Sequence, residues 1–259
     1  MTGFFNITAC IPMKLTLKRT LPLLILSALP LVSGCSKKSD APEPGGSTQS
    51  LFNSTPKRYD LQSGIVTYEP MVIMGITSLS TLYFDDYGRR EARETVTDSN
   101  IMGMKSHEKK VDITDGNYVI SYEVEKIVNG KDETSKVATK TDMRQAQEMA
   151  MQMAKTFDVE QMKRDFDYRE EGTEVVAGVT GTKYSVSFNK ERKDQRVYGV
   201  LYKKISLSTQ MGGISVKAQK IEENVAVPAS KFEVPSGYTI QEVDLEKEMA
   251  MPMPGQSDN

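Results

Sequence analysis

Residues 118–125 read YVISYEVE, with a large apolar side chain at every second position: Tyr118, Ile120, Tyr122 and Val124. Successive side chains of a β-strand point to opposite faces, so a period of two predicts a strand with one buried face. The same period recurs further along the chain in Tyr184, Val186 and Phe188. These two stretches predict half-buried strands.

Glycine-containing dipeptides divide the surrounding sequence into further strands. They are Asp115-Gly116, Asn129-Gly130 and Gly212-Gly213. Each tolerates positive φ, which the tight type I′ turns of antiparallel hairpins require. We therefore expect antiparallel strands over residues 111–113, 118–128, 131–140, 197–210 and 214–227. The run 71–84 is apolar on both faces in places, which predicts one long strand covered on two sides.

Between the two sets of strands, residues 141 to about 169 show the spacing of an amphipathic helix. Thr141 or Asp142 can cap its N-terminus. One helical face would carry Met143, Ala146, Ala150, Met153 and Phe157, and Met149, Met162 and Phe166 extend that apolar surface. Asp158 can mark a break, so one long helix and two shorter ones both remain open. Strands, helix and strands in this order predict an α+β fold.

The N-terminal residues 1–34 have the features of a secretory signal. Three basic residues precede an apolar segment: Lys14, Lys18 and Arg19. That segment, residues 21–31, is shorter than the roughly 20 residues that a membrane span needs. Met13 stands directly before the basic residues and is the expected true start.

The apolar segment leads into Val32-Ser33-Gly34-Cys35, which looks like a bacterial lipobox. The implied events are cleavage before Cys35 and attachment of acyl chains such as palmitate at that residue. Because Ser36 follows, resemblance to enterobacterial sorting favours the outer membrane, facing the periplasm. The alternative is a plain signal peptide with an incidental cysteine.

The rest of the chain divides by composition into three parts. Residues 35–58 are rich in Ser, Pro, Gly and charge, which is typical of a flexible linker. Residues 59–245 form one domain, large enough to bury about two-thirds of its unfolded surface. Residues 246–259 are expected to be a disordered tail.

Composition excludes several classes of function. The chain has 33 basic and 35 acidic residues, so its net charge is −2. Most nucleic-acid binders are strongly basic, so this charge argues against nucleic-acid binding. One His and two Cys are too few for a His/Cys zinc site or a disulfide framework. Met-x-Met runs, as in Met102/Met104, leave Cu(I) binding as a remote alternative. We expect no bound metal and no cofactor.

Catalytic signals are weak. His107 lies in a charged stretch, and no orienting partner for it is visible in the sequence. The carboxylate pairs are adjacent in sequence, so in strands they would point to opposite faces: Asp85/Asp86, Glu170/Glu171 and Glu222/Glu223. Gly-rich nucleotide motifs and a GxSxG elbow do not occur. We therefore expect that the protein is not an enzyme, with a hydrolase that uses His107 as a remote alternative.

Three segments resemble a family of bacterial envelope lipoproteins of unknown function, DUF4412. They are residues 81–92 with the run YFDDYG, residues 174–184, and residues 224–238. That family is similar to the LolA/LolB lipoprotein-localisation superfamily. The resemblance implies an open, strongly curved antiparallel sheet, a half-barrel, with the Met-rich helical segment across its concave face.

The implied fold suggests an apolar cavity between the sheet and the helical segment. Candidate ligand-binding residues are Met143, Met149, Met153, Phe157 and Met162 on the helix and Tyr118, Ile120, Tyr122, Tyr184, Val186 and Phe188 on the sheet. The first hypothesis is a lipid-anchored carrier or binder of an acyl chain or other hydrophobic ligand. The alternative is a structural or protein-interaction module with a filled core, which meets an envelope partner at exposed sheet edges.

Overall fold

The computed structural model describes residues 57–148, 159–187 and 195–243. All of them belong to Ser36–Asn259, the second of the two units into which the chain divides. The expected signal peptide, lipidated Cys35 and C-terminal tail lie outside the described residues. So do Met149, Met153, Phe157 and Phe188.

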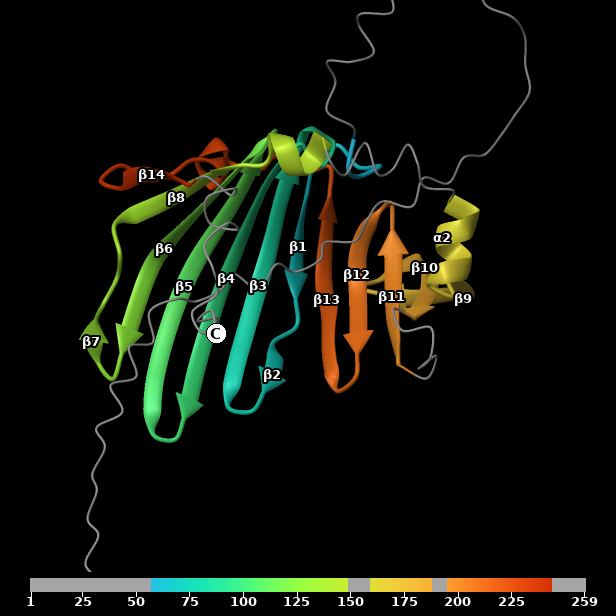
Figure 1. Ribbon diagram of the computed structural model, residues 1–259, viewed down its shortest axis with the longest axis horizontal. Coiled ribbons are helices and arrows are strands. Elements are labelled where there is room, and N and C mark those ends of the chain that lie inside the picture. Colours follow the sequence, from blue (N-terminus) through green and yellow to red (C-terminus); the bar gives the residue numbers. More distant parts are fainter. Residues whose placement is uncertain (1–56, 149–158, 188–194, 244–259) are drawn as a thin grey trace, which may run out of the picture. The chain divides into compact units, whose positions relative to one another are not determined.

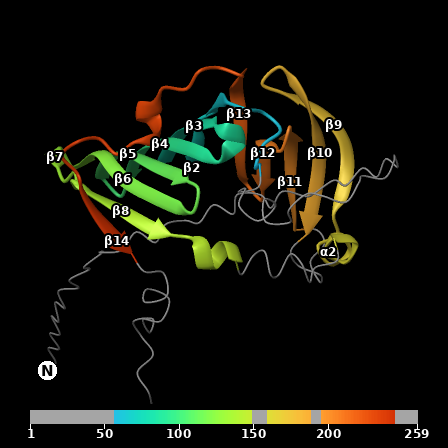
Figure 2. The same ribbon diagram turned by 90° about the horizontal axis from the view of Figure 1, so that it is seen from above.

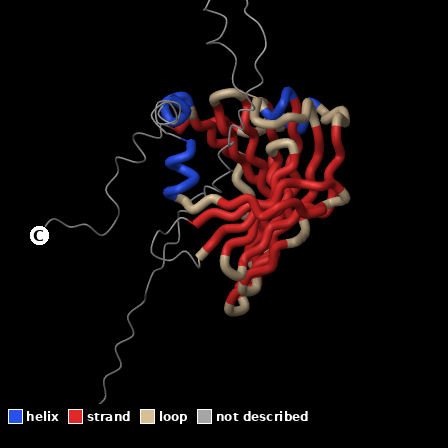
Figure 3. Tube along the Cα trace, turned by 90° about the vertical axis from the view of Figure 1, so that its right-hand side faces the viewer, coloured by secondary structure: helices blue, strands red, loops and turns tan. Residues whose placement is uncertain are grey.

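Strands make up most of the described chain, and the helical segments lie at its margin (Figure 3). The strands are β1 (Gly64–Tyr68), β2 (Met71–Ile73), β3 (Ile76–Asp85), β4 (Arg90–Ile101), β5 (Met104–Asp115), β6 (Tyr118–Val128), β7 (Lys131–Asp132), β8 (Val137–Asp142), β9 (Arg169–Val176), β10 (Val179–Ser187), β11 (Arg196–Tyr202), β12 (Ile205–Met211), β13 (Ile214–Glu223) and β14 (Thr239–Val243).

These strands form one large, open, curved sheet (Figures 1 and 2). Its order is β14-β8-β6-β5-β4-β3-β1-β13-β12-β11-β10-β9, with β2 paired to β3 and β7 paired to β6. The pairs are antiparallel except β14 with β8, which is parallel. Because β1 lies between β3 and β13, the first strand of the domain joins its N-terminal and C-terminal halves.

The expected glycine turns are confirmed, but three of the expected strands are interrupted. Residues 131–140 contain β7 and the first part of β8, with residues 133–136 in neither strand. The run 71–84 turns back at Met74 and Gly75, which both have positive φ, so it forms β2 and β3. Residues 197–210 turn at Lys203 and Lys204, also with positive φ, so they form β11 and β12. Two lysines are not a typical turn sequence, and Met-Gly is a weaker turn signal than Asn-Gly or Asp-Gly, which is why both predictions failed.

The helical prediction holds only in part. Residues 144–148 are helical, and α2 spans Val159–Asp165, with residues 149–158 between them outside the described part. Thr141 and Asp142 belong to β8, although Asp142 Oδ1 accepts a hydrogen bond of 2.9 Å from the backbone N–H of Arg144. Ala146, placed on the expected apolar face, is exposed.

Two hydrophobic cores lie on opposite faces of β3, because alternate side chains point to opposite sides. Leu82 and Phe84 belong to the first core, whereas Tyr83 packs against the second. The first core contains Leu61, Val66, Tyr68, Leu82, Phe84, Val176, Val200, Ile205, Leu207 and Ala218. The second contains Ala92, Val111, Ile113, Tyr122, Ala138 and Phe232.

The segment that closes the second core includes the short 3₁₀ helix η3 (Ala229–Phe232). The Phe232 side chain is buried, and the ring of Tyr238 lies edge-on to that of Tyr122 at 5.0 Å. The Tyr238 hydroxyl donates a 2.6 Å hydrogen bond to the Glu123 carbonyl. Residues 224–238, one of the three segments of family resemblance, therefore cover one face of the sheet.

Candidate functional site

The predicted ligand-binding residues on β6 mostly lie in a filled core. Tyr122 is buried in the second core, and Ile120 packs against it. The half-buried Tyr118 ring lies 4.3 Å from Nζ of Lys140. The prediction placed a ligand against these side chains. In the structure they contact other protein groups instead, and the closing segment is one of these.

The other predicted residues lie on different elements. Tyr184 and Val186 are on β10, and the half-buried Tyr184 ring stacks on Tyr168 at 6.0 Å. Met143 is half-buried just before the helical residues 144–148, and Met162 belongs to α2 but its side chain lies outside the described part. Seven strands separate β6 from β10 in the sheet, and the second core, which includes Tyr122 and contacts Ile120, contains neither Tyr184 nor Val186.

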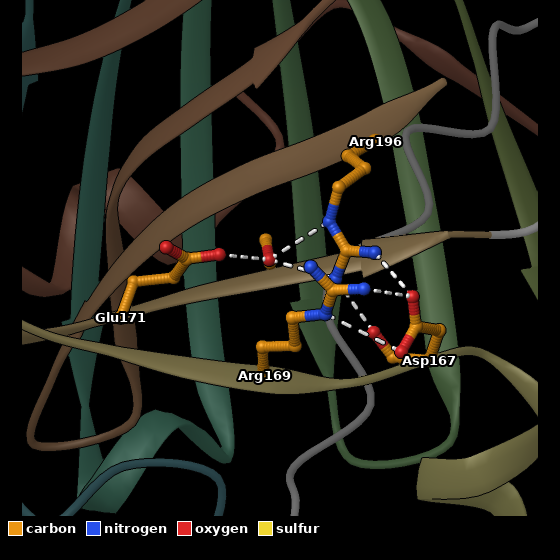
Figure 4. A network of polar contacts seen from close by, with 5 residues as sticks. Asp167, Arg169, Glu171 and Arg196 are labelled. Atoms are coloured by element: carbon orange, nitrogen blue, oxygen red, sulfur yellow. Dashed lines mark hydrogen bonds and ion pairs between the residues drawn. The ribbon is translucent and has the colours of Figure 1, made fainter. Parts of the chain in front are cut away.

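A partly buried polar network joins β9, β10 and β11 to Asp167, which follows α2 (Figure 4). The Arg196 side chain is only 6% exposed and donates from Nη1 to Asp167 Oδ2 at 2.7 Å. Its Nη2 donates to the Asp167 carbonyl at 2.6 Å, and its Nε donates to Ser185 Oγ at 3.0 Å. Ser185 in turn donates to Glu171 Oε1, and Arg169 pairs with Asp167 at 2.8 Å.

The hydrogen bonds from Arg169 and Arg196 lower the pKa of the Asp167 carboxyl. Each donor nitrogen of Arg196 finds an acceptor within this network. A buried guanidinium so satisfied is a structural anchor. The network therefore explains how β9, β10 and β11 are held together at this edge of the sheet.

A second polar cluster holds the residues that precede β1. Burial raises the pKa of the Glu91 carboxyl, while Arg58, Tyr59 and Arg93 act in the opposite direction. Arg58 Nη1 lies 3.1 Å from Glu91 Oε1, close enough for an ion pair but at an angle that makes no hydrogen bond. Burial and, next, the charge of Glu91 raise the pKa of the Tyr59 hydroxyl well above its ordinary value.

The third feature is a surface hollow of about 380 Å³ around His107. The hollow is lined by Gly75, Thr77, Asp98, Ser99, Asn100, Lys105, Ser106, His107, Ile127 and Gly130. His107 Nδ1 lies 2.7 Å from Asp98 Oδ1, and its Nε2 lies 3.8 Å from Glu125 Oε2. The structure thus supplies the orienting carboxylate that the sequence did not show, because β4 and β5 place Asp98 directly opposite His107.

Exposed apolar side chains lie at three hairpins of the sheet, two of which also contribute residues to this hollow. They are Val72, Met74, Ile101, Met102, Met104, Met211 and Ile214. We call these seven residues the hairpin-end surface, because they lie at the β2–β3, β4–β5 and β12–β13 hairpins, whose turns point to the same end of the sheet (Figure 1). Met74 is 93% exposed and Met102 is fully exposed.

The first two of these hairpins are joined by a hydrogen bond of 2.9 Å from the Asn100 backbone N–H to the Gly75 carbonyl. Met74 has a φ of 45° and Met102 a φ of 51°, the left-handed region that Gly and Asn prefer. A large apolar residue is a poor choice for such a turn on grounds of folding alone. Outliers of this kind occur often at functional positions.

Within the described ranges, no group of three or more His, Cys, Asp or Glu residues could hold a metal ion. In the same part of the chain, no helix is both long and apolar enough to cross a membrane.

No protein-family model matches this chain, and no curated protein matches it. Among solved structures, an uncharacterised conserved protein of Thermus thermophilus has a TM-score of 0.43 at 10% identity, over 71% of this chain and 92% of that one. The complex of MucA and MucB from Pseudomonas aeruginosa gives 0.35 at 15% identity, over 70% of this chain and 58% of that one.

A β-barrel-like protein of the DUF1849 family from Brucella abortus gives a TM-score of 0.30 at 12% identity, over 64% of this chain and 100% of that one. These likenesses are distant and concern the fold. The resemblance to DUF4412 and to the LolA/LolB superfamily has no family-model match and stays a prediction.

The hairpin-end surface was not predicted from the sequence, although a signal existed. Met74-Gly75 and Met102-Gly103 are the same dipeptide, each bounded by apolar or β-branched residues. Reading a Met-Gly pair as a type I′ turn would have placed both methionines at hairpin ends. Without the structure, Met102/Met104 suggested only a remote metal-binding pattern.

Proposed function

We propose that this chain is a non-catalytic, lipid-anchored protein of the bacterial envelope that binds another envelope protein through the hairpin-end surface. The observation that carries the proposal is the presence of seven exposed apolar side chains at three hairpins whose turns point to the same end of the sheet. Contiguous exposed apolar side chains, especially with a polar rim, mark interaction sites. Methionine is adaptable and enriched at such surfaces.

The filled second core supports an interaction module over a ligand carrier. Ile120 and Tyr122, two of the expected cavity residues, pack beneath Phe232 and Tyr238. The hollow beside the hairpin ends supplies polar groups, Asp98, His107 and Lys105, that can orient a partner. Polar groups at the margin of an apolar surface are the usual composition of a protein–protein interface.

The envelope location and lipid anchor rest on the N-terminal sequence pattern that ends in Cys35. Detecting an acylated Cys35 by mass spectrometry of the membrane fraction tests this part. A Cys35→Ala variant should be found unacylated and no longer held by the membrane.

Site-specific photo-crosslinking of the full chain tests the binding surface. A photoreactive residue at Met102 should give one discrete adduct with an envelope protein, whereas the same residue at the exposed Ser230 on η3 should not. The identified partner should then bind a Met102→Asp variant about ten-fold more weakly or worse. Equal adducts from both positions, or unchanged binding by Met102→Asp, would overturn the proposal.

The carrier hypothesis has its own test. Masses of the purified chain are compared under native and denaturing conditions, and a separate sample is extracted with organic solvent. A near-stoichiometric acyl species released on denaturation would favour the carrier. A clean mass in both conditions agrees with the filled core.

A further inference from the structure

We propose that Met74 and Met102 are sites of reversible oxidation, at which a peroxide or hypohalous oxidant converts the apolar ends of two hairpins into polar ones. The inference concerns the chemistry of the thioethers. It rests on the proposed function only for its consequence, which is weaker binding by the hairpin-end surface after oxidation.

Both methionines are unusually open to an oxidant. Met74 is 93% exposed and Met102 is fully exposed, whereas Met71 in the same first hairpin is half-buried. A Cβ built at Gly103, next to Met102, would meet no atom within 4 Å, so the turn projects into open space. Oxidation of methionine follows the access of the oxidant to the sulfur.

The backbone holds both side chains at the ends of the hairpins. Each methionine is the first positive-φ residue of its turn and is followed by a glycine with a φ of 82°. The bond from the Asn100 N–H to the Gly75 carbonyl ties the two turns together. The sulfur atoms therefore remain exposed in the folded state and need no unfolding to react.

The reaction balances with one oxidant. Hydrogen peroxide transfers one oxygen to the thioether sulfur as the O–O bond breaks, and the other oxygen leaves as water. The sulfur loses two electrons and becomes a sulfoxide. In the reverse step a dithiol supplies two electrons through a methionine sulfoxide reductase, the sulfoxide oxygen leaves as water, and the dithiol becomes a disulfide.

The physical consequence is a change of surface polarity at the proposed interface. A thioether is apolar and adapts to a partner, whereas a sulfoxide carries a strong dipole and accepts hydrogen bonds. Burying an unpaired polar group at an interface is unfavourable. Oxidation should therefore release a partner, and reduction should restore binding.

The first experiment treats the full folded chain with limiting hydrogen peroxide and follows each methionine by peptide mapping. Met74 and Met102 should form sulfoxide about five-fold faster than Met71, and a reductase with a dithiol should reverse both. Rates for Met74 and Met102 equal to that for Met71 would overturn the proposal.

The second experiment measures the retention of the folded chain on a hydrophobic-interaction column before and after peroxide. A Met74→Leu/Met102→Leu variant keeps apolar hairpin ends without thioethers, and Met71→Leu is the matched control. Peroxide should shorten the retention of the wild type and Met71→Leu clearly more than that of the double variant. An equal shift in all three would overturn the proposal.

Failure of this proposal can be told from failure of the proposed function. Selective, reversible oxidation with no adduct from Met102 in crosslinking would leave the oxidation sites and remove the partner surface. If Met74 and Met102 oxidise no faster than Met71 but Met102 still gives a discrete adduct, the oxidation sites are removed and the partner surface remains.

Discussion

The ring of Tyr59 lies directly over Gly88, and a Cβ added at Gly88 would sit 2.6 Å from the ring carbon Cδ2. Gly88 ends η2 (Asp86–Gly88) and has a φ of 79°. The Tyr87 carbonyl beside it accepts hydrogen bonds from the backbone N–H groups of Arg58 and Tyr59, at 2.9 and 3.0 Å. The YFDDYG run therefore serves to hold the segment that precedes β1.

Gly88→Ala should destabilise the domain by about 2–3 kcal/mol, because it combines left-handed backbone strain with a clash against the half-buried Tyr59 ring. Urea denaturation followed by circular dichroism measures the change. Gly130→Ala is the matched control, since Gly130 has nearly the same φ, 80°, with nothing within 4 Å. An equal loss in both variants would show that the contact with Tyr59 contributes nothing.

Met102→Asn should stabilise the domain by about 0.5–1 kcal/mol, because Asn tolerates a φ of 51° better than Met does. The same variant should lose affinity for the crosslinked partner. A gain in stability with a loss of binding would show that Met102 is retained for function. If Met102→Asn instead unfolds the domain, Met102 contributes to folding and the interpretation is wrong.

Asn129 provides the reverse experiment, since it also has a φ of 51° and is followed by a glycine. Its Oδ1 accepts a 2.9 Å hydrogen bond from the Lys105 backbone N–H. Asn129→Met should therefore destabilise the domain by about 1–2 kcal/mol. Thermal or urea denaturation checks the value, and no change would contradict the argument from turn strain.

Arg196→Met should destabilise the domain by about 3 kcal/mol or more, because it leaves Ser185 and Asp167 without a buried partner. Urea denaturation at neutral pH measures the loss. Arg144→Met is the control, since the Arg144 side chain is 59% exposed and pairs only at the surface. A change at Arg144 is expected to stay within about 0.5 kcal/mol.

The ion pair of Asp167 predicts a loss of stability in acid. The pKa of its carboxyl is lowered in the folded state, so its contribution is present above the unfolded pKa. That contribution is lost as pH falls below about 4 and through the lowered folded value. Unfolding free energies between about pH 7 and pH 2.5 should fall less steeply for Asp167→Asn than for the wild type. Parallel curves would contradict the prediction.

Glu91 should show the opposite dependence, because burial raises the pKa of its carboxyl. Above the folded pKa the charged carboxylate opposes folding, and protonation of the native state removes that cost as pH falls. The stability of Glu91→Gln relative to the wild type should therefore be greatest near pH 7 and shrink toward about pH 4.5. A relative stability that does not change over this interval would show that Arg58 and Arg93 fully offset the burial.

Local patterns determined much of the sheet. The alternation of Tyr118, Ile120 and Tyr122 placed β6, and Asp115-Gly116, Asn129-Gly130 and Gly212-Gly213 marked three of its turns. β9 pairs with β10 through the Ala177–Gly178 turn, which lies within residues 174–184, one of the three segments of family resemblance. These features depend on residues close in sequence, so they can be predicted without knowing the fold.

Which face of a strand meets which segment could not be predicted in this way. The alternation at Tyr122 showed that one side is buried, but only the tertiary structure showed that Phe232 and Tyr238 cover it. The partner of His107 likewise depends on the register that sets Asp98 opposite it. In both contacts, the residues are brought together by the pairing of strands and by the path of the chain across the sheet.

By itself, the sequence determined the period of the strands, the positions of the glycine turns and the expected signal that ends at Cys35. Only the tertiary structure decided that Met74, Met102 and Met211 lie at one end of the sheet. The physical reason is that local backbone preferences act over a few residues. The gathering of three separate hairpins depends instead on the order and register in which all their strands pair.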